Sequence, residues 1–267
     1  MNALPTGQFY GQTNQKLQVG HLTLTDTEYT HPWVDWHYHE NAYFTFILQG
    51  KVLEGNRKER YTCTAGSLLF HHWQEAHYNQ KPEGYTRGFH VELNADWFQS
   101  YEIKPLQGSI DIQHPQAKRL MYNLVKEAKR HASYTPLAME ALLIELFGEL
   151  TQTSNRLYIR EPVWVKQLRE LLHDAPEEPW TLNQLAEHLA LHPVYLCREM
   201  PRYFNCRFGE YLRMIRLQKA LPLLLKQGLS LTHIALDCGF ADQSHFIRSF
   251  RNQYELTPFA YRKLFVG

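Results

Sequence analysis

The sequence predicts an α+β chain with several domains: an N-terminal β domain, a helical linker and a C-terminal all-α domain. Two observations predict this arrangement. Residues 1 to about 100 contain short apolar or alternating runs separated by glycine and proline, as in a β-barrel or sandwich. Beyond residue 113, apolar side chains recur at helical spacing. We therefore expect domains at residues 1–110, 111–160 and 161–267.

The composition is that of an ordinary globular protein. Of 267 residues, 44% are hydrophobic and 21% are charged. No apolar run approaches the roughly 20 residues that a membrane-spanning helix needs. Residues 1–20 lack a signal-peptide pattern, and the four cysteines are scattered without metal-finger spacing. We expect a cytoplasmic protein with reduced cysteines and no membrane partner.

The charges are distributed unevenly along the chain. From His192 to the end, eleven Lys and Arg residues stand against five acidic ones, a balance of +6. Because the whole chain has a formal net charge of +1, the preceding residues carry −5. A basic end on a nearly neutral protein is typical of a module that binds nucleic acid, although a solvated basic surface gives the same count.

Three stretches of the first hundred residues have the pattern of strands. Leu17–Leu24 and Tyr85–Leu93 alternate between apolar and polar residues, and Tyr43–Leu48 is a continuous apolar run. Turn residues such as Gly50 and Gly66 separate these stretches. Strands at this spacing predict a barrel or a sandwich.

Two helices are expected in the linker. Leu120, Leu124 and Ala128 fall on one face of the first, and the second is strongly apolar from Leu142 to Leu150. Such a pair can form the surface of a homodimer or pack against the β domain, and both interpretations stay open.

From residue 161 onward the pattern is helical throughout, and the helices fall into two helix-turn-helix units. Thr181 followed by Gln184 is typical of a capping box that opens the first unit, Thr181–Phe204. The second unit is Ser230–Tyr254, and one long helix over residues 208–227 joins the two. In each unit the second helix would enter the major groove of DNA and the first would support it.

Particular residues of both units and of the joining helix match a known pattern. They are Leu185, Ala186, Tyr211, Arg216, Leu217, Ala220, Ile234, Ala235, Gly239, Phe240, Gln243, Ser244, His245, Phe246, Arg248, Phe250, Thr257, Pro258, Tyr261 and Arg262. Through these residues the last hundred or so positions resemble the DNA-binding domain of the AraC/XylS family of bacterial transcription regulators. The second unit carries the stronger part of the resemblance.

The resemblance implies that double-stranded DNA is the partner. Activation is typical of the family, so RNA polymerase is an expected second partner. Arg suits guanine and Gln suits adenine, each worth about 1–3 kcal/mol of discrimination. The expected base-reading residues are Val194, Tyr195, Arg198, Gln243, Ser244, Ile247 and Arg248, and the expected phosphate contacts are Arg202, Arg251, Arg262 and Lys263.

Two prolines depart from the family pattern. Pro201 falls where a recognition helix would continue, and an interior proline costs a helix about 3 kcal/mol because it lacks a backbone N–H. The base-reading residues of that helix precede it, so we expect DNA reading to survive with a distorted last turn. Pro222 interrupts the joining helix and could change the angle between the units.

A second resemblance lies in the β domain. His37 and His39 form an HxH pair, and His77 ends a later segment. With Gly50 and Gly66, they resemble the two motifs of the cupin barrel, whose residues converge on a metal. The expected fold is thus a cupin-like β-barrel, a helical linker and two helix-turn-helix units. The departures are Tyr43 in place of the motif's glutamate, and His72 and Gln74 in place of a proline and a glycine.

The cupin resemblance implies an effector pocket inside the barrel. Its expected residues are His37, His39, Tyr43 and His77, with Trp36, His71 and His72 as walls. The three imidazoles of His37, His39 and His77 can bind a divalent metal with one open position. A small organic effector held without metal, and packed histidines with no ligand, are the alternatives.

Together these features predict a transcription regulator without enzymatic activity, which binds specific DNA sequences and responds to a small effector. The alternative is a metal-dependent cupin enzyme with an accessory helical domain. The missing glutamate and the two helix-turn-helix units count against that alternative. A third hypothesis is a regulator that needs no ligand and uses its barrel only for dimerisation.

Overall fold

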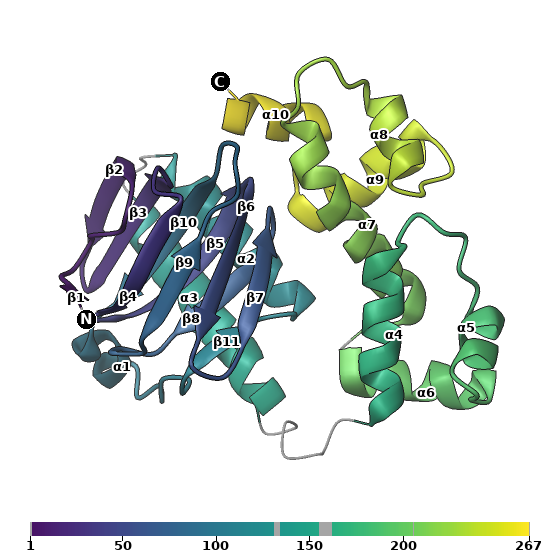
Figure 1. The fold of residues 1–267 in the computed structure, drawn as a ribbon, viewed down its shortest axis with the longest axis horizontal. Coiled ribbons are helices and arrows are strands. Elements are labelled where there is room, and N and C mark those ends of the chain that lie inside the picture. The colour runs from purple at the N-terminus through teal and green to yellow at the C-terminus, as the bar shows by residue number, and fades with distance from the viewer. Residues whose placement is uncertain (1, 131–133, 155–161, 205, 267) are drawn as a thin grey trace. The chain divides into compact units, whose positions relative to one another are not determined.

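The chain forms two compact units in the computed structural model (Figure 1). One unit spans Met1–Gly148 and contains the described strands, and the other spans Glu149–Gly267 and is helical. The predicted change from a β pattern to a helical one is therefore confirmed. No helix in the described part of the chain has the length and apolar character needed to cross a membrane. The structure describes residues 2–130, 134–154, 162–204 and 206–266.

The strands among the described residues form two open sheets. One sheet has the order β1-β4-β9-β6-β7, and the other has the order β11-β8-β5-β10-β3-β2. The predicted barrel is corrected to this pair of sheets, because each ladder stops at edge strands and does not close into a ring. The strands are β1 (Asn2–Leu4), β2 (Gln12–Val19), β3 (Leu22–Glu28), β4 (Trp33–His39), β5 (Ala42–Gln49), β6 (Lys51–Asn56), β7 (Arg60–Thr64), β8 (Leu68–His71), β9 (His77–Gln80), β10 (Arg87–Leu93) and β11 (Ser109–Asp111).

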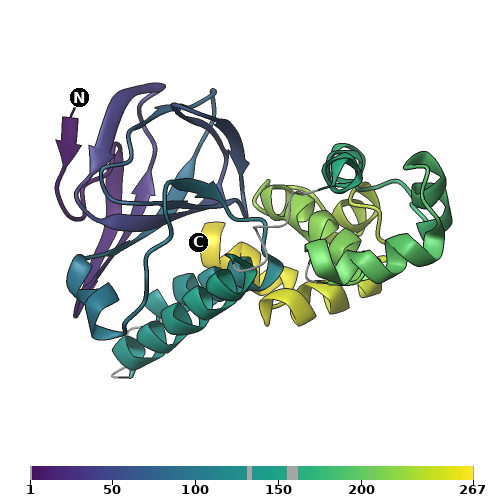
Figure 2. The ribbon, with the colours of Figure 1, turned by 90° about the horizontal axis from the view of Figure 1, so that it is seen from below.

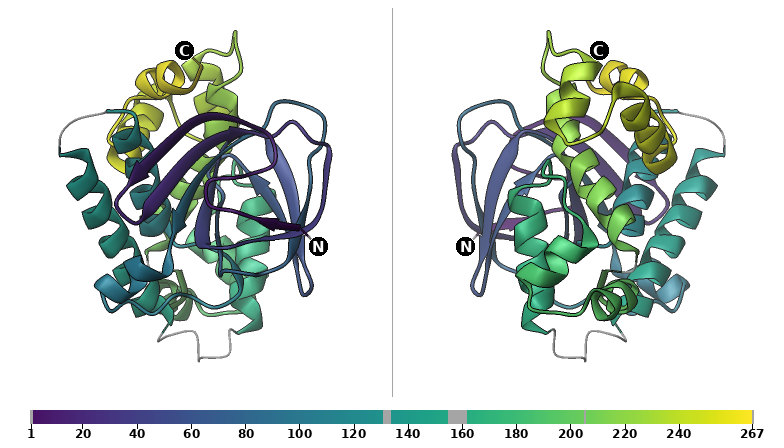
Figure 3. Two further views of the ribbon diagram at one scale, coloured as in Figure 1. Left: turned by 90° about the vertical axis from the view of Figure 1, so that its left-hand side faces the viewer. Right: turned by 90° about the vertical axis from the view of Figure 1, so that its right-hand side faces the viewer.

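Both faces of the six-stranded sheet are covered. Successive side chains of a strand point to opposite faces. On β5, Tyr43 and Thr45 face the space between the sheets, whereas the ring of Phe44 lies 5.4 Å from that of Phe147 on a covering helix. Figures 2 and 3 show the helices along this outer face. The helices are α1 (Ala95–Ser100), α2 (Pro115–Ala128) and α3 (Thr135–Ser154).

The second unit contains two helix pairs at the predicted positions. Thr181 forms the predicted capping box, since its hydroxyl accepts from the N–H of Gln184 at 3.3 Å and its own N–H donates to Gln184 Oε1 at 2.9 Å. The side chain of Asp242 caps the last helix of the second pair. The helices are α4 (Val163–Asp174), α5 (Leu182–His188), α6 (Pro193–Phe204), α7 (Phe208–Leu224), α8 (Leu231–Asp237), α9 (Gln243–Tyr254) and α10 (Pro258–Val266).

Each helix pair has its own apolar core. In the first pair, Leu185 and Leu196 are fully buried and pack with α4 and α7. In the second, Phe246 and Phe250 are fully buried. Helix α6 continues through Pro201 and ends at Phe204, so this proline does not end the helix. These cores fix which side of α6 and α9 remains at the surface.

Candidate functional site

A small pocket lies between the two sheets of the first unit. Side chains from β4, β5, β6, β9 and β10 line it together with the segment before β2. The space inside is about 30 Å³, enough for one or two water molecules. An organic ligand would need a lining residue to move. The lining residues are Phe9, Tyr10, Tyr29, His31, Val34, His37, His39, Tyr43, Thr45, Val52, Glu54, His77, Asn79, Lys81 and His90.

The structure brings the three predicted metal-binding histidines together. One ring nitrogen from each of His37, His39 and His77 lies within 4.8 Å of the others. Nδ1 of His37 donates to the carbonyl of Asp35 at 2.8 Å, and Nδ1 of His77 donates to the carbonyl of Glu75 at 3.0 Å. Because a carbonyl only accepts, Nδ1 carries the proton in both rings and Nε2 keeps its lone pair.

Tyr43 contacts the histidines with its hydroxyl and its ring. The hydroxyl donates to Nε2 of His77 at 3.0 Å, because the proton of that imidazole is on Nδ1. The ring stacks on His71 with centres 4.6 Å apart. Burial, followed by the charge of Glu54, raises the pKa of Tyr43 well above its usual value, so the phenol keeps its proton. Tyr43 is therefore a hydrogen-bond donor where the cupin motif has an anionic ligand.

Two buried carboxylates belong to the site and were missed by sequence reasoning. Glu54 Oε1 lies 2.9 Å from Nε2 of His71. Burial alone would raise the pKa of Glu54, but the adjacent His71 lowers it below its usual value. Glu92, which is 1% exposed, accepts a hydrogen bond from the backbone N–H of Gly7. Burial raises the pKa of Glu92 to about 7.

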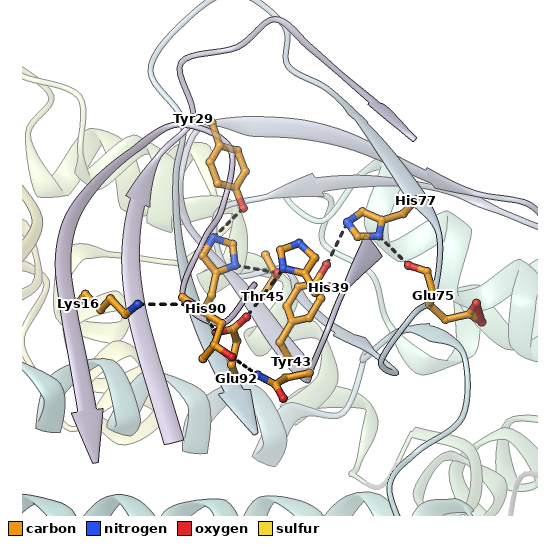
Figure 4. A network of polar contacts seen from close by, with 12 residues as sticks. Lys16, Tyr29, His39, Tyr43, Thr45, Glu75, His77, His90 and Glu92 are labelled. Atoms are coloured by element: carbon orange, nitrogen blue, oxygen red, sulfur yellow. Dashed lines mark hydrogen bonds and ion pairs between the residues drawn. The ribbon is translucent and has the colours of Figure 1, made fainter. Parts of the chain in front are cut away.

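His90 was also missed, although the sequence held a signal for it. Its ring lies between Thr45 Oγ1, 3.0 Å from Nδ1, and the hydroxyl of Tyr29, 3.3 Å from Nε2 (Figure 4). Positions 90 and 92 share one face of an alternating strand. A histidine and a glutamate on the same face of the predicted strand Tyr85–Leu93 indicate a polar site.

Four histidines of the pocket, His37, His39, His77 and His90, are neutral at neutral pH. Burial is the main cause in each ring, and it lowers the pKa of His39 to about 2 and that of His90 to about 3. It also lowers the pKa values of His37 and His77. Neutral imidazole is the form that binds metals and accepts hydrogen bonds.

The segment of residues 5–11, between β1 and β2, covers the pocket. The ring of Phe9 stacks on His90 with centres 3.6 Å apart and planes 8° apart, and it lies 4.6 Å from the ring of His39. Tyr10 of the same segment contacts His37 edge-on at 5.0 Å. Aromatic side chains of the N-terminal segment therefore occupy the mouth of the predicted effector pocket.

Of the three predicted walls, only His71 contacts the pocket residues, with its ring 4.8 Å from that of His77. Trp36 packs edge-on against Tyr78, and His72 stacks on Trp73. The prediction of Trp36 and His72 as walls is wrong. Trp36 is next to His37 on β4, so the strand directs it to the opposite face.

Helix α9 has a polar face at the surface. Ser244, Arg248 and Arg251 are exposed, whereas Phe246 and Phe250 on the other face are buried. The exposed face carries two guanidinium groups and one hydroxyl. This is the chemistry that contacts phosphates and base edges.

Two other predicted base-reading residues of α9 are partly exposed. The side chain of Gln243 accepts a hydrogen bond from the hydroxyl of Thr232 at 2.6 Å. This bond links α9 to α8 and orients the amide. Ile247 is also partly exposed, one turn further along.

Helix α6 also presents predicted base-reading residues. Val194 is 68% exposed, and Tyr195 is partly exposed beneath the guanidinium of Arg198, whose Cζ lies 5.7 Å from the ring centre. Arg198 and Arg202 both contact the carboxylate of Glu199, at 3.2 and 3.4 Å. The carboxylate of Glu199 is buried, whereas the side chains of Arg198 and Arg202 are more than half exposed, so both guanidinium groups remain at the surface.

Arg262, a predicted phosphate contact, makes hydrogen bonds within the protein. Its guanidinium donates to the carbonyls of Leu224 and Leu229 at 2.7 and 2.9 Å. These bonds hold the end of α7 and favour a structural role for Arg262. Lys263, by contrast, is exposed.

Comparison with known proteins identifies the class of both units. Residues 19–147 match the model of the AraC-like ligand binding domain, and residues 185–264 match a helix-turn-helix domain. The chain thus joins a ligand-binding type of β domain to a helix-turn-helix domain. It belongs to the AraC family of HTH-type transcriptional regulators.

Individual relatives are similar over parts of their length. The uncharacterized regulator YpdC of Escherichia coli is 28% identical over 189 residues, which are 66% of this chain and 64% of YpdC. The regulator GadX of Escherichia coli is 30% identical over 122 residues, 45% of this chain and 44% of GadX. The chain therefore matches less than two thirds of either relative. The crystal structure of ToxT from Vibrio cholerae is 14% identical, with a TM-score of 0.41 over 91% of this chain and 99% of ToxT.

Proposed function

We propose that the protein is a sequence-specific DNA-binding transcription regulator that responds to a small effector. The observation that carries this proposal is the exposed polar face of α9, whose opposite face is buried in a helix-turn-helix domain. Both helix pairs would act as helix-turn-helix units, with α6 and α9 in successive major grooves. Activation through RNA polymerase, a cytoplasmic location and dimerisation through residues 111–160 are parts of the same proposal.

The test of DNA recognition is selection from random duplexes at physiological salt with the full chain. We expect enrichment of a sequence with two contacted segments about 10 base pairs apart. A variant with Ser244→Ala and Arg248→Ala should lose enrichment of the segment that α9 contacts. No preference over random duplex for the wild-type chain would contradict the proposal.

We propose that the effector binds in the pocket between the sheets, as the resemblance to cupins predicts. Its residues are His37, His39, Tyr43 and His77, as predicted, with Glu54, His90 and Glu92 added from the structure. The buried polar atoms support this: Nδ1 of His39 and Oε1 of Glu92 have no hydrogen-bond partner among the described residues. Unsatisfied buried polar atoms are costly, and a polar ligand would satisfy them.

A divalent metal is a second candidate for the pocket, because the three histidine nitrogens lie within 4.8 Å of one another. The donor set fits a metal that prefers imidazole, since carbonyls hold Nδ1 of two rings and leave Nε2 free for coordination. The rings would move inward slightly, and Tyr43 would give up its bond to His77. When bound, such an ion would supply a positive charge and one open coordination position.

Elemental analysis of the purified untagged chain tests the metal candidate. We expect near-stoichiometric metal in the wild type and none in a His37→Ala/His77→Ala variant. No metal in either protein after incubation with divalent ions would exclude this candidate and leave the organic effector. If the variant also keeps an undiminished effector response on DNA, the pocket is only a scaffold.

A further inference from the structure

The slot filled by Phe9 is a binding site built for a flat ring. Its walls are three aromatic side chains: His90 is parallel to the Phe9 ring at 3.6 Å, His39 is tilted at 4.6 Å and Tyr43 meets it edge-on at 5.4 Å. Phe9 is only partly buried and belongs to a segment without helix or strand. An aromatic molecule could therefore replace its ring from the outside.

A carboxylate lies beside this slot. Glu92 is 1% exposed, and one of its oxygens accepts from the backbone N–H of Gly7, two residues before Phe9. The other oxygen has no hydrogen-bond partner in the described part of the chain and lies 3.8 Å from Nδ1 of His39. Lys16 is a nearby cation, and its ammonium donates to the carbonyl of Thr6 at 3.2 Å. A second donor would therefore complete the hydrogen bonding of Glu92.

The segment thus presents a ring to the aromatic walls and an N–H to the carboxylate. We propose that it imitates the effector, and that the pocket takes a small planar aromatic compound carrying a protonated amine. The ring of this compound would replace Phe9 against His90, and its ammonium group would pair with Glu92. This inference rests on the proposed function, because it names the class of molecule that the effector pocket binds.

The alternatives differ in charge and shape. Above the pKa of Glu92, which is about 7, an aromatic carboxylate would place a second negative group beside this side chain and would be repelled. A saturated ring of the same charge would lose the flat contact with His90, whose plane lies within 8° of that of Phe9. Three probes therefore distinguish an aromatic amine from an aromatic carboxylate and from a saturated amine: benzylamine, benzoate and cyclohexylmethylamine.

The test is calorimetric titration of the full chain with these probes in wild type, Phe9→Ala and Phe9→Ala/Glu92→Gln proteins. We expect benzylamine to bind Phe9→Ala at least about tenfold more tightly than wild type, since the competing ring is gone. The added Glu92→Gln change should weaken this binding by about ten- to a hundredfold, as expected for a hydrogen bond to a charged group. Gln8→Ala, at an exposed position of the same segment, should behave as wild type.

Equal affinities for benzylamine and benzoate, or no effect of Glu92→Gln, would overturn the inference. If Phe9→Ala does not fold, as judged by circular dichroism, Phe9→Leu takes its place, since it also removes the flat ring. Selection of DNA by the same proteins separates the two proposals. Enriched DNA without benzylamine binding would contradict only the effector class, whereas no enriched DNA would contradict the proposed function.

Discussion

In the pocket of the first unit, Nδ1 atoms of His37 and His77 donate to carbonyls, whereas His71 contacts a carboxylate and His90 lies between two hydroxyls. The carbonyl partners of His37 and His77 lie only two residues away along the chain, whereas the partners of His71 and His90 come from other strands. The tautomer of an imidazole depends on such partners and on the local backbone geometry, so the HxH motif could predict the presence of the ligands but not their proton positions. The same holds for Tyr43, whose hydrogen bond to His77 joins residues 34 positions apart.

At the residue scale, Arg248 and Arg251 should have different effects on DNA binding. Both are exposed on α9, but the family resemblance places Arg248 at bases and Arg251 at phosphates. Arg248→Ala should cost about 1–3 kcal/mol at one position of the selected site and relax its sequence preference. Arg251→Ala should weaken all duplexes alike. Binding to a panel of single-base variants distinguishes the two, and identical profiles would contradict the assignment.

The buried lysine of α2 predicts a dependence of stability on pH. Lys118 is 7% exposed, its ammonium donates to Gln113 at 3.1 Å, and burial lowers its pKa to about 8. Between this value and its ordinary value of 10.5, the unfolded chain binds more protons than the folded one. The contribution of Lys118 to the free energy of unfolding therefore rises with pH across this window.

Replacement of Lys118 by Met should remove this rise. Below pH 8, where the folded state buries the charge, we expect Lys118→Met to exceed the wild type in stability by on the order of 1 kcal/mol. The advantage should shrink as the pH rises toward 10.5. Urea titrations at a series of pH values measure it, and a difference that is constant with pH would contradict the explanation.

At the element scale, the turn between α8 and α9 requires glycine for two reasons. Gly239 has φ +80°, and a Cβ there would lie 2.7 Å from the Cα and carbonyl oxygen of Glu177. Gly228 after α7 has φ +84° with no atom within 4 Å of its Cβ position. Both glycines therefore have a left-handed backbone conformation, and Gly239 in addition lies close to the backbone of Glu177.

This pair gives a matched prediction. Gly228→Ala should cost about 1–2 kcal/mol, the price of a left-handed conformation for a residue with a Cβ. Gly239→Ala should cost clearly more, because the backbone at Glu177 has to move as well. Chemical denaturation of both variants measures the difference. Equal losses of stability would show that the contact with Glu177 is not tight.

The helices were predictable from local signals, whereas only part of the pocket was. Thr181 and Gln184 mark the start of α5 in any context, because the capping box is a local motif. The pairing of β1 with β4 joins Leu4 to His39, and no local signal announces it. Glu54 was missed for the same reason. It is followed by Gly55 and Asn56, which indicate a turn, and only the tertiary fold brings its carboxylate to His71.

At the scale of the whole molecule, the positive charge of the C-terminal region is partly engaged within the protein. Arg216 donates to the carbonyls of Pro176 and Glu178, and Lys219 pairs with Glu177 at 2.6 Å. With Arg262, these are three of the eleven basic residues counted after His192. The predicted phosphate contacts that remain exposed are Arg202, Arg251 and Lys263.

The salt dependence of binding to a random duplex should reflect these three exposed residues and not all four predicted phosphate contacts. Each phosphate contact contributes about −0.9 to the slope of log K against log salt, so three contacts predict a slope of about −3. Replacing Arg251 by Ala should reduce the slope by about 1.

Lys166 is equally cationic and exposed, but it lies on α4 and pairs with Glu170, so Lys166→Ala is the control that should leave the slope unchanged. Fluorescence anisotropy between low and physiological salt measures all three proteins. An equal reduction in both variants would mean that DNA is held by the general positive charge of the unit and not by the face that includes α9.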